Sequence, residues 1–309
     1  LKSIIKPSTH VWMMTGTPAS QSPADAYGLA KIVNPDGVPN FYTAWRDQVM
    51  IPTTRFKWTP KNSSRQDVYT ALQPAIRFTK SECLDLPPVM YQTRLVPLTP
   101  QASKYYTTLK TQLLIEAAGE EVSAVNAAAA LSKLLQISGG AVYTDKHDVV
   151  EFDVSPRLNT LMEVIDETEH KVIIFVPFRH TIDVVARHLT SQGVTNEIIN
   201  GDVPARERAV IINRFQTADL PRVLIIQPQA ASHGVTLTAA NTVVFWSPVM
   251  SVETYLQCIA RIDRVGQKNS MTVVHLQGSE VERKMYAMLQ GKVDMHEKLV
   301  DLYKQELGV

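Results

Sequence analysis

Residues 257–267 read Q-C-I-A-R-I-D-R-V-G-Q and stand between two apolar runs, 242–246 (T-V-V-F-W) and 271–276 (M-T-V-V-H-L). Runs of this length and composition are typical of buried strands. A helix over about 252–265 that joins them is the crossover of a parallel sheet. The stretch therefore predicts an α/β domain, in which ligand sites gather at the strand ends.

The polar residues of this stretch are spaced for one helix face. Gln257, Arg261 and Arg264 follow one another at intervals of four and three residues, which align side chains along a helix. Two permanently charged, fork-shaped guanidiniums projecting together would suit a polyphosphate. The alternative is a solvated helix face, because arginine is most often exposed.

Composition places limits on the class of protein. The chain has 309 residues, enough for two domains, and its 45% hydrophobic and 20% charged content fits a soluble globular protein. A net charge of +1 means that any nucleic-acid surface must be a local basic groove. Because the chain begins with Leu1, we expect a fragment of something longer.

Cysteine usage and the apolar runs indicate a cytoplasmic location. The two cysteines, Cys83 and Cys258, are too few for a disulfide framework and indicate neither a zinc site nor any other metal site. There is no signal peptide, and no apolar run approaches the ~20 residues that span a bilayer. We therefore expect no membrane partner.

The second half of the chain alternates strands with helices. The predicted strands are 171–176, 197–200 and 222–227, and the predicted helices are 181–191 and 204–215. This alternation predicts a doubly wound α/β domain with right-handed crossovers. Helices over 280–306 are expected to brace it.

The first half has a different pattern. Residues 1–80 offer one strand candidate, 11–14, and a single strand cannot make a sheet. We therefore expect the tail end of another α/β lobe whose earlier strands are missing. An extended stretch, 87–98, leads into two predicted helices, 101–118 and 123–137.

Several separated motifs then match one family in order. Residues 15–18 (T-G-T-P) resemble motif III of superfamily-two helicases, the Swi/Snf-type DNA translocases in particular. The further matches are 86–88 (L-P-P) with Tyr105-Tyr106 to the lobe-connecting segment, 171–175 with 181–189 to motif IV, 230–237 to motif V and 257–267 to motif VI. His233 before the motif V glycine, and stretch 251–257, look most like the phage-encoded short branch.

The resemblance implies a motor of two RecA-like lobes, with ATP and Mg²⁺ in the cleft between them and DNA across both. Residues 1–85 would be the C-terminal remainder of lobe 1, and 86–309 would be lobe 2 with a helical insertion at about 99–140. No G-x-x-x-x-G-K-[ST] phosphate loop and no Asp-Glu pair before motif III occur in this sequence. The chain alone should therefore not hydrolyse ATP, and its partner would be the N-terminal lobe of the same protein.

The resemblance also assigns roles on the ATP side. Arg261 and Arg264 would be the arginine fingers, with pairing to carboxylates such as Asp263 as the alternative. Gln257 would orient an arginine or touch phosphate, unless it is a plain surface amide. Gly234 and Thr236 would form the ATP-binding turn, although the family commonly carries asparagine at the position of Thr236.

On the DNA side, Thr15, Gly16 and Thr17 would couple the nucleotide state to the grip on DNA, or form an ordinary turn. The candidates for contact with the DNA backbone are Phe178, Arg179, His180, Gln227, Gln229 and His233. For Phe178 a place in the core is the alternative, for Gln227 and Gln229 a connecting loop, and for His233 a cap of the turn. Arg206 and Arg208 are weaker candidates.

Two functions of different classes follow. The first is the C-terminal part of an ATP-dependent helicase or translocase that acts on duplex or branched DNA with little sequence specificity. The second is a non-catalytic nucleic-acid or protein-binding module that kept the fold, since fold does not settle function. A metabolic nucleotide-binding enzyme is disfavoured because no glycine-rich dinucleotide fingerprint is present.

Overall fold

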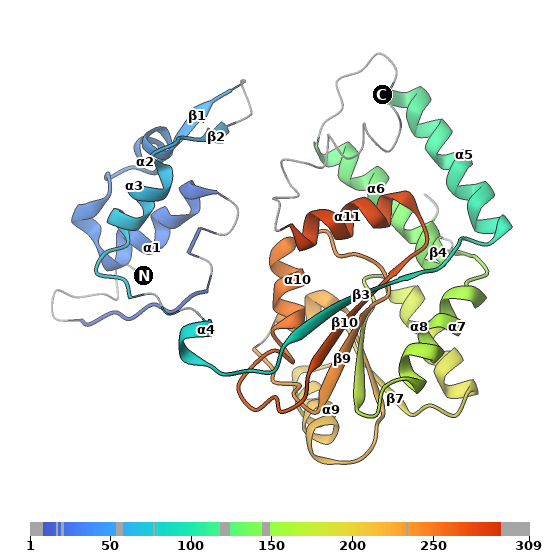
Figure 1. Cartoon of the computed structure of the whole chain (residues 1–309). Helices are drawn as coiled ribbons and strands as arrows, with labels where there is room; N and C mark the ends of the chain where they lie inside the picture. The colour runs from blue at the N-terminus through green and yellow to red at the C-terminus, as the bar shows by residue number, and fades with distance from the viewer. Residues whose placement is uncertain are drawn as a thin grey trace. The chain divides into compact units, whose positions relative to one another are not determined.

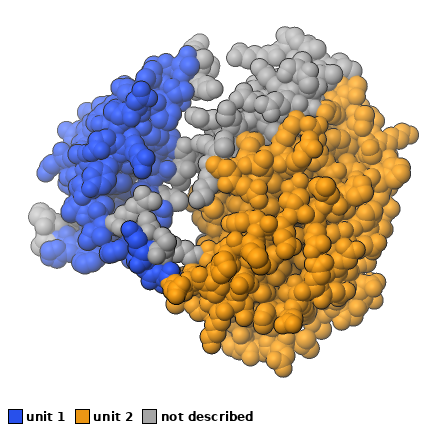
Figure 2. All heavy atoms as spheres, in the orientation of Figure 1, with its two compact units in different colours: residues 1–84 blue, residues 85–309 orange. Residues whose placement is uncertain are grey.

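The computed structural model describes residues 9–16, 18–19, 22–53, 58–76, 78, 80–117, 124–143, 149–232 and 234–291. The chain divides into two compact units, Leu1–Leu84 and Asp85–Val309, which are coloured separately in Figure 2. Thr17 and His233, both singled out from the sequence, lie outside the described residues.

Unit 1 is built mainly of short helices around Trp45, which is fully buried with Ala26, Ala30 and Val49. Its elements are η1 (Pro23–Asp25), α1 (Ala26–Val33), η2 (Pro35–Gly37), α2 (Tyr42–Val49), α3 (Ser64–Ala71), α4 (Lys80–Cys83) and the antiparallel pair β1 (Met50–Pro52) and β2 (Trp58–Pro60). The aromatic anchor of α2 therefore organises the small core of this unit.

The predicted strand at 11–14 is wrong. Residues 9–16 form neither helix nor strand, and the side chains of Trp12 and Met14 are 92% and 98% exposed. A strand needs a neighbour that pairs with its backbone N–H and C=O groups, and the described part of unit 1 holds no parallel sheet that it could join.

Unit 2 contains a six-stranded sheet in the order β3-β10-β9-β6-β8-β7 (Figure 1). All neighbouring strands are parallel. The strands are β3 (Val89–Leu95), β6 (Lys171–Phe175), β7 (Asn196–Ile199), β8 (Val223–Ile226), β9 (Ala240–Phe245) and β10 (Met271–Gln277). The doubly wound α/β prediction is confirmed, and the extended stretch 87–98 supplies the edge strand β3.

Helices cover both faces of this sheet. On β6, the side chains of Val172 and Ile174 belong to one core cluster and those of Ile173 and Phe175 to the other. The first cluster lies under α7 (Ser155–Asp166) and α8 (Arg179–Ser191), and the second under α6 (Ala124–Gly139), α9 (Ala205–Thr217), α10 (Val252–Ile259) and α11 (Glu280–Gln290). Burial on two faces explains why the central strands are continuous apolar runs.

The helices in the range 99–140, which were expected as an insertion, pack on the second of these faces. Helix α5 (Pro100–Ala117) packs against α6, and α6 in turn contacts α11. Leu131, Leu134 and Leu135 of α6 are fully buried in the core. A small antiparallel pair, β4 (Ala141–Tyr143) with β5 (Val149–Glu151), follows α6. In the described part of the chain, none of the helices combines the length and apolar character that crossing a bilayer requires.

Helix α11 is the first of the helices expected over 280–306. Helix α11 ends at Gln290, and residues 292–309 lie outside the described part. Its start is fixed by a capping box, in which Ser279 accepts from the backbone N–H of Glu282 while Glu282 accepts from the backbone N–H of Ser279.

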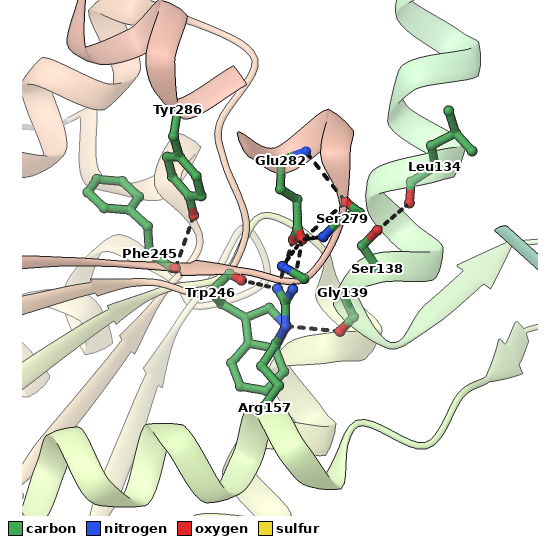
Figure 3. A network of polar contacts seen from close by, with 10 residues as sticks. Leu134, Ser138, Gly139, Arg157, Phe245, Trp246, Ser279, Glu282 and Tyr286 are labelled. Carbon is green, nitrogen blue, oxygen red and sulfur yellow. Dashed lines mark hydrogen bonds and ion pairs between the residues drawn. The ribbon is translucent and has the colours of Figure 1, made fainter. Parts of the chain in front are cut away.

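A buried ion pair ties α11 to α7 across the end of β9 (Figure 3). The side chains of Arg157 and Glu282 are 3% and 0% exposed, and two N–H···O bonds of 2.8 Å join them. Arg157 also donates to the carbonyl of Trp246, whose indole donates to the carbonyl of Gly139. Both ions are therefore satisfied, and α6, α7, α11 and the end of β9 meet at this cluster.

Removing one partner of this pair should destabilise unit 2 strongly. We expect Glu282→Ala to lower the free energy of unfolding by about 3–5 kcal/mol, because it leaves the Arg157 guanidinium buried and unpaired. Chemical denaturation followed by circular dichroism measures this loss. The matched control is Arg283→Ala, which removes an exposed partner 3.5 Å from Glu280 and should cost less than about 1 kcal/mol. Similar small losses in both variants would contradict the prediction.

Candidate functional site

Helix α10 is shorter than the sequence predicts. It ends at Ile259, so Gln257 lies on the helix whereas Arg261 and Arg264 lie beyond it. The backbone continues through a tightened turn, in which the N–H groups of Arg261 and Ile262 bond to carbonyls three residues earlier. The single helix face expected over 252–265 is therefore wrong. Gly266, at φ 99°, continues the turn with a backbone conformation that suits glycine.

Residues 260–270, between α10 and β10, are called the arginine loop and lie at the amino ends of β9 and β10. The backbone N–H of Leu237, just before β9, donates to the carbonyl of Arg261 at 2.9 Å. The loop then leads directly into Met271, the first residue of β10. The sequence indicated a site at the strand ends, and the two candidate arginines lie at the amino edge.

Arg261 is 7% exposed, and its Nε is buried without a hydrogen-bond partner. Burial lowers the pKa of this guanidinium, and the positive charge of Arg264 lowers it further. Neither arginine forms an ion pair with a carboxylate of the described residues. Two neighbouring cations without an anion make a place that favours a negatively charged ligand.

Arg264 is partly exposed and binds the turn before β9. Its Nη1 donates to the carbonyls of Gly234 at 3.2 Å and Val235 at 3.3 Å. Gly234 is exposed, has φ 54°, and would have no atom within 4 Å of an added Cβ. Its backbone is therefore open to a ligand.

The two other residues assigned to ATP lie near this loop. Thr236 is partly buried between Val235 and Leu237 in the turn. Gln257 is partly buried on α10, and its amide donates to Oε1 of Glu253 at 3.0 Å. The structure thus brings the motif V turn and the two arginines together, with Gln257 tied to its own helix.

Gln267 holds the arginine loop in place, a role that the sequence analysis missed. It is 5% exposed, and its Nε2 donates to the carbonyl of Ala240 at 2.8 Å. Its Oε1 accepts from the backbone N–H groups of Lys268 and Asn269, each at 3.1 Å. A glutamine directly after the Gly266 turn is the available signal, but spacing alone does not show that it is buried.

A buried histidine of β10 contacts α10 through a hydrogen bond to Tyr255. His275 of β10 is fully buried, and its Nε2 lies 3.0 Å from the hydroxyl of Tyr255 on α10. Its ring stacks on Tyr286 with centroids 4.3 Å apart, and Nδ1 lies 3.4 Å from Nε2 of Gln290. Burial lowers the pKa of His275 to about 4. The imidazole is therefore neutral where the protein is folded at neutral pH.

The described residues of unit 2 that were assigned to DNA lie on the opposite edge, at the carboxyl ends of the strands. Phe178 precedes α8, directly after β6, and packs partly against the main core. Nη2 of Arg179 lies 2.9 Å from Oδ1 of Asp202, in the loop after β7. His180 pairs with Glu151, and this hydrogen bond holds the pKa of Glu151 below its usual value.

Gln227 and Gln229 extend this edge. Gln227 follows β8, and its Oε1 accepts from the backbone N–H of Gly201 at 3.2 Å. Gln229 is exposed on η3 (Pro228–Ser232), which packs against α10. The η3 segment therefore connects the carboxyl edge with the element that carries Gln257.

Arg206 and Arg208 separate in the structure. Arg206 is exposed on α9, whereas Arg208 is partly buried and donates to the carbonyls of Asn200 and Val203. In unit 1, Thr15 and Gly16 are exposed and belong to no helix or strand.

With this geometry established, unit 2 is a RecA-like α/β domain. The C-terminal part of the Fun30 ATPase domain matches 72% of the chain and is itself covered to 98%, with TM-score 0.56 and 16% identity. The Sulfolobus solfataricus SWI2/SNF2 ATPase core in complex with double-stranded DNA matches 92% of the chain and is covered to 60%, with TM-score 0.55 and 19% identity. At these identities the likeness concerns the fold.

Matches of the sequence to known domain families identify the protein family more closely than the fold does. Residues 5–141 match the SNF2-related domain, and residues 156–266 match the helicase conserved C-terminal domain. The chain thus carries both domains in this order and belongs to the Swi/Snf-type superfamily-two helicase family.

Curated relatives agree with this family. Chromodomain-helicase-DNA-binding protein 1-like of Mus musculus is 25% identical over 94% of this chain and 33% of its own length. An uncharacterized ATP-dependent helicase of Mycoplasma genitalium is 27% identical over 85% of this chain and 25% of its own length. The chain therefore spans about a third or less of these relatives.

The neutral state of His275 should make stability depend on pH. The pKa is about 4 when folded and about 6.5 when unfolded, so the unfolded chain takes up the proton first as pH falls. Stability contributed by the neutral imidazole is then lost between about pH 6.5 and 4, at about 1.4 kcal/mol per pH unit. We expect a loss of about 3 kcal/mol from this group, measured as the free energy of unfolding at both ends of the range.

Two variants separate this effect from the titration of other groups. His275→Gln should flatten the pH dependence by about the same 3 kcal/mol. His170→Gln, which changes an exposed histidine, is the matched control. An unaltered pH dependence in His275→Gln would contradict the prediction.

Proposed function

We propose that this chain is the C-terminal part of an ATP-dependent DNA helicase or translocase of the Swi/Snf type, in which Arg261 and Arg264 are the arginine fingers. The observation that carries the proposal is the pair of cations at the amino edge of the sheet. They lie close enough for one to lower the pKa of the other, and neither has a carboxylate partner among the described residues.

The residues present fit a nucleoside triphosphate. The buried Nε of Arg261 has no hydrogen-bond partner, and Nη1 of Arg264 donates to uncharged backbone carbonyls. A polyphosphate would give both guanidiniums the anion that they lack. The open backbone at Gly234 allows close approach. Thr236 in the same turn and Gln257 on α10 would add polar contacts. ATP with Mg²⁺ supplies the free energy of phosphoryl transfer when bound.

In this proposal the two arginines contribute to catalysis through their positive charge. Positively charged fingers stabilise the negative charge that develops on the phosphoryl group during transfer, worth factors of about 10³ to 10⁵ in rate. The anchor at Gln267 and the support from Tyr255 and His275 keep the loop in one conformation. A loop positioned in advance does not have to be ordered during each turnover.

DNA would bind along the carboxyl edge of unit 2. Arg179, His180, Gln227 and Gln229 lie there, with Phe178 as a partly buried neighbour, and the DNA complex of the Sulfolobus core supports this class of ligand. Contacts to phosphates would hold the duplex or a branched DNA without reading its sequence. His233, Thr15, Gly16 and Thr17 keep their proposed roles in DNA contact and in coupling.

The phosphate loop and the Asp-Glu motif would come from the N-terminal RecA-like lobe of the same protein, so residues 1–309 alone would not hydrolyse ATP. The rival is an adaptor without motor activity, and a parent protein that lacks both motifs would favour it. A phage origin, with action in the cytoplasm of a bacterial host, belongs to the same proposal.

The test is the ATPase of the full-length protein. Arg261→Ala and Arg264→Ala should each lower DNA-stimulated turnover by a factor of about 10³ or more, while DNA affinity without nucleotide changes little. The loss follows because a finger contributes to the transition state and does not hold DNA.

A matched control is Arg283→Ala, which removes a guanidinium that is 67% exposed on α11. Its turnover should equal that of the wild type. Wild-type turnover in both finger variants would refute the assignment, whereas absence of ATPase in the wild-type protein would favour the adaptor.

A further inference from the structure

Two hydrogen-bond donors at the carboxyl edge of the sheet bond to acceptors of the protein itself. Strands β6, β8 and β7 are adjacent and parallel, so the loops after them lie side by side. Nη2 of Arg179 lies 2.9 Å from Oδ1 of Asp202, and the N–H of Gly201 donates to Gln227 at 3.2 Å. An incoming phosphate would have to replace these internal acceptors.

The loop that carries Asp202 keeps its shape by other bonds. Arg208 donates to the carbonyls of Asn200 at 3.3 Å and Val203 at 3.2 Å. The backbone N–H of Asp202 donates to Oδ1 of Asn200 at 3.0 Å. None of these bonds uses the carboxylate of Asp202. Neutralising that carboxylate should therefore leave the loop in place.

The Arg179–Asp202 pair contributes little to stability. The two side chains are 51% and 68% exposed, and exposed pairs of this kind are worth little because water screens them. Its consequence is electrostatic, because it cancels a cation on the edge where the DNA backbone would lie.

We propose that Asp202 sets the affinity of this edge for DNA by competing with phosphate for Arg179. The inference rests on the proposed DNA-binding function and adds a residue to it. A motor that moves along DNA has to release each phosphate that it holds. A carboxylate that takes the place of the departing phosphate makes this release easier.

The experiment compares wild type with Asp202→Asn, which removes the charge and keeps the side-chain size. The affinity of the full-length protein for a fluorescent duplex of mixed sequence is measured without nucleotide by anisotropy, between roughly 50 and 200 mM KCl. We expect tighter binding by a factor of about five at the low-salt end, as for removal of one nearby like charge in water. The plot of log affinity against log salt should steepen by about 0.9, as for one more phosphate contact.

Asp219→Asn is the matched control, because it makes the same charge change in the exposed segment just before β8, on the opposite edge of the sheet. It should leave the salt slope as in the wild type. Thermal unfolding by circular dichroism checks that every variant is folded.

A second background tests the mechanism. In Arg179→Gln, the change Asp202→Asn should no longer steepen the salt slope, because no cation is released. A full gain in that background would overturn the competition with Arg179. If the wild type binds duplex and Asp202→Asn has the same affinity and salt slope, this inference alone is overturned. If neither the wild type nor Asp202→Asn binds duplex, the DNA-binding proposal is overturned as well.

Discussion

The backbone carbonyl of Ala240, at the amino end of β9, needs a hydrogen-bond donor, and this need determines how the arginine loop is held. The carbonyl of Ala240 is buried, and a buried backbone carbonyl without a partner costs free energy. The amide of Gln267 supplies that partner at 2.8 Å, while the carbonyl of Arg261 accepts from Leu237 at 2.9 Å. The loop is thereby fixed to the sheet by the same bonds that complete the strand. A rigid support of this kind is what allows two cations to remain close together.

The two candidate sites lie on opposite edges of one sheet, and elements of the chain connect them. The arginines are at the amino ends of β9 and β10, whereas Arg179, Asp202 and Gln227 follow the carboxyl ends of β6, β7 and β8. The η3 segment begins at the carboxyl edge and packs against α10, which leads into the arginine loop. The two edges are therefore joined by a short stretch of chain and by the packing of η3 against α10.

Much of the fold could be predicted from periodicity, because a parallel sheet covered on both faces needs strands that are apolar throughout. The runs that became β6, β8, β9 and β10 carry this signal, and their order of alternation with helices implied the doubly wound domain. The errors fall where a local pattern competes with tertiary context. Residues 11–14 have strand composition but no partner strand, and the helical spacing of Arg261 and Arg264 continues past the point where α10 ends.

The sequence by itself determined the identity of the two arginines, the glycines of their turns and the apolar runs that surround them, because these depend on residue type and spacing. Only the tertiary structure decided that Arg261 is buried while Arg264 reaches the carbonyl of Gly234, that Gln267 anchors the loop, and that Asp202 faces Arg179. These relations join residues far apart in the chain. They depend on how strands β6 to β10 are ordered and aligned, which no local spacing encodes.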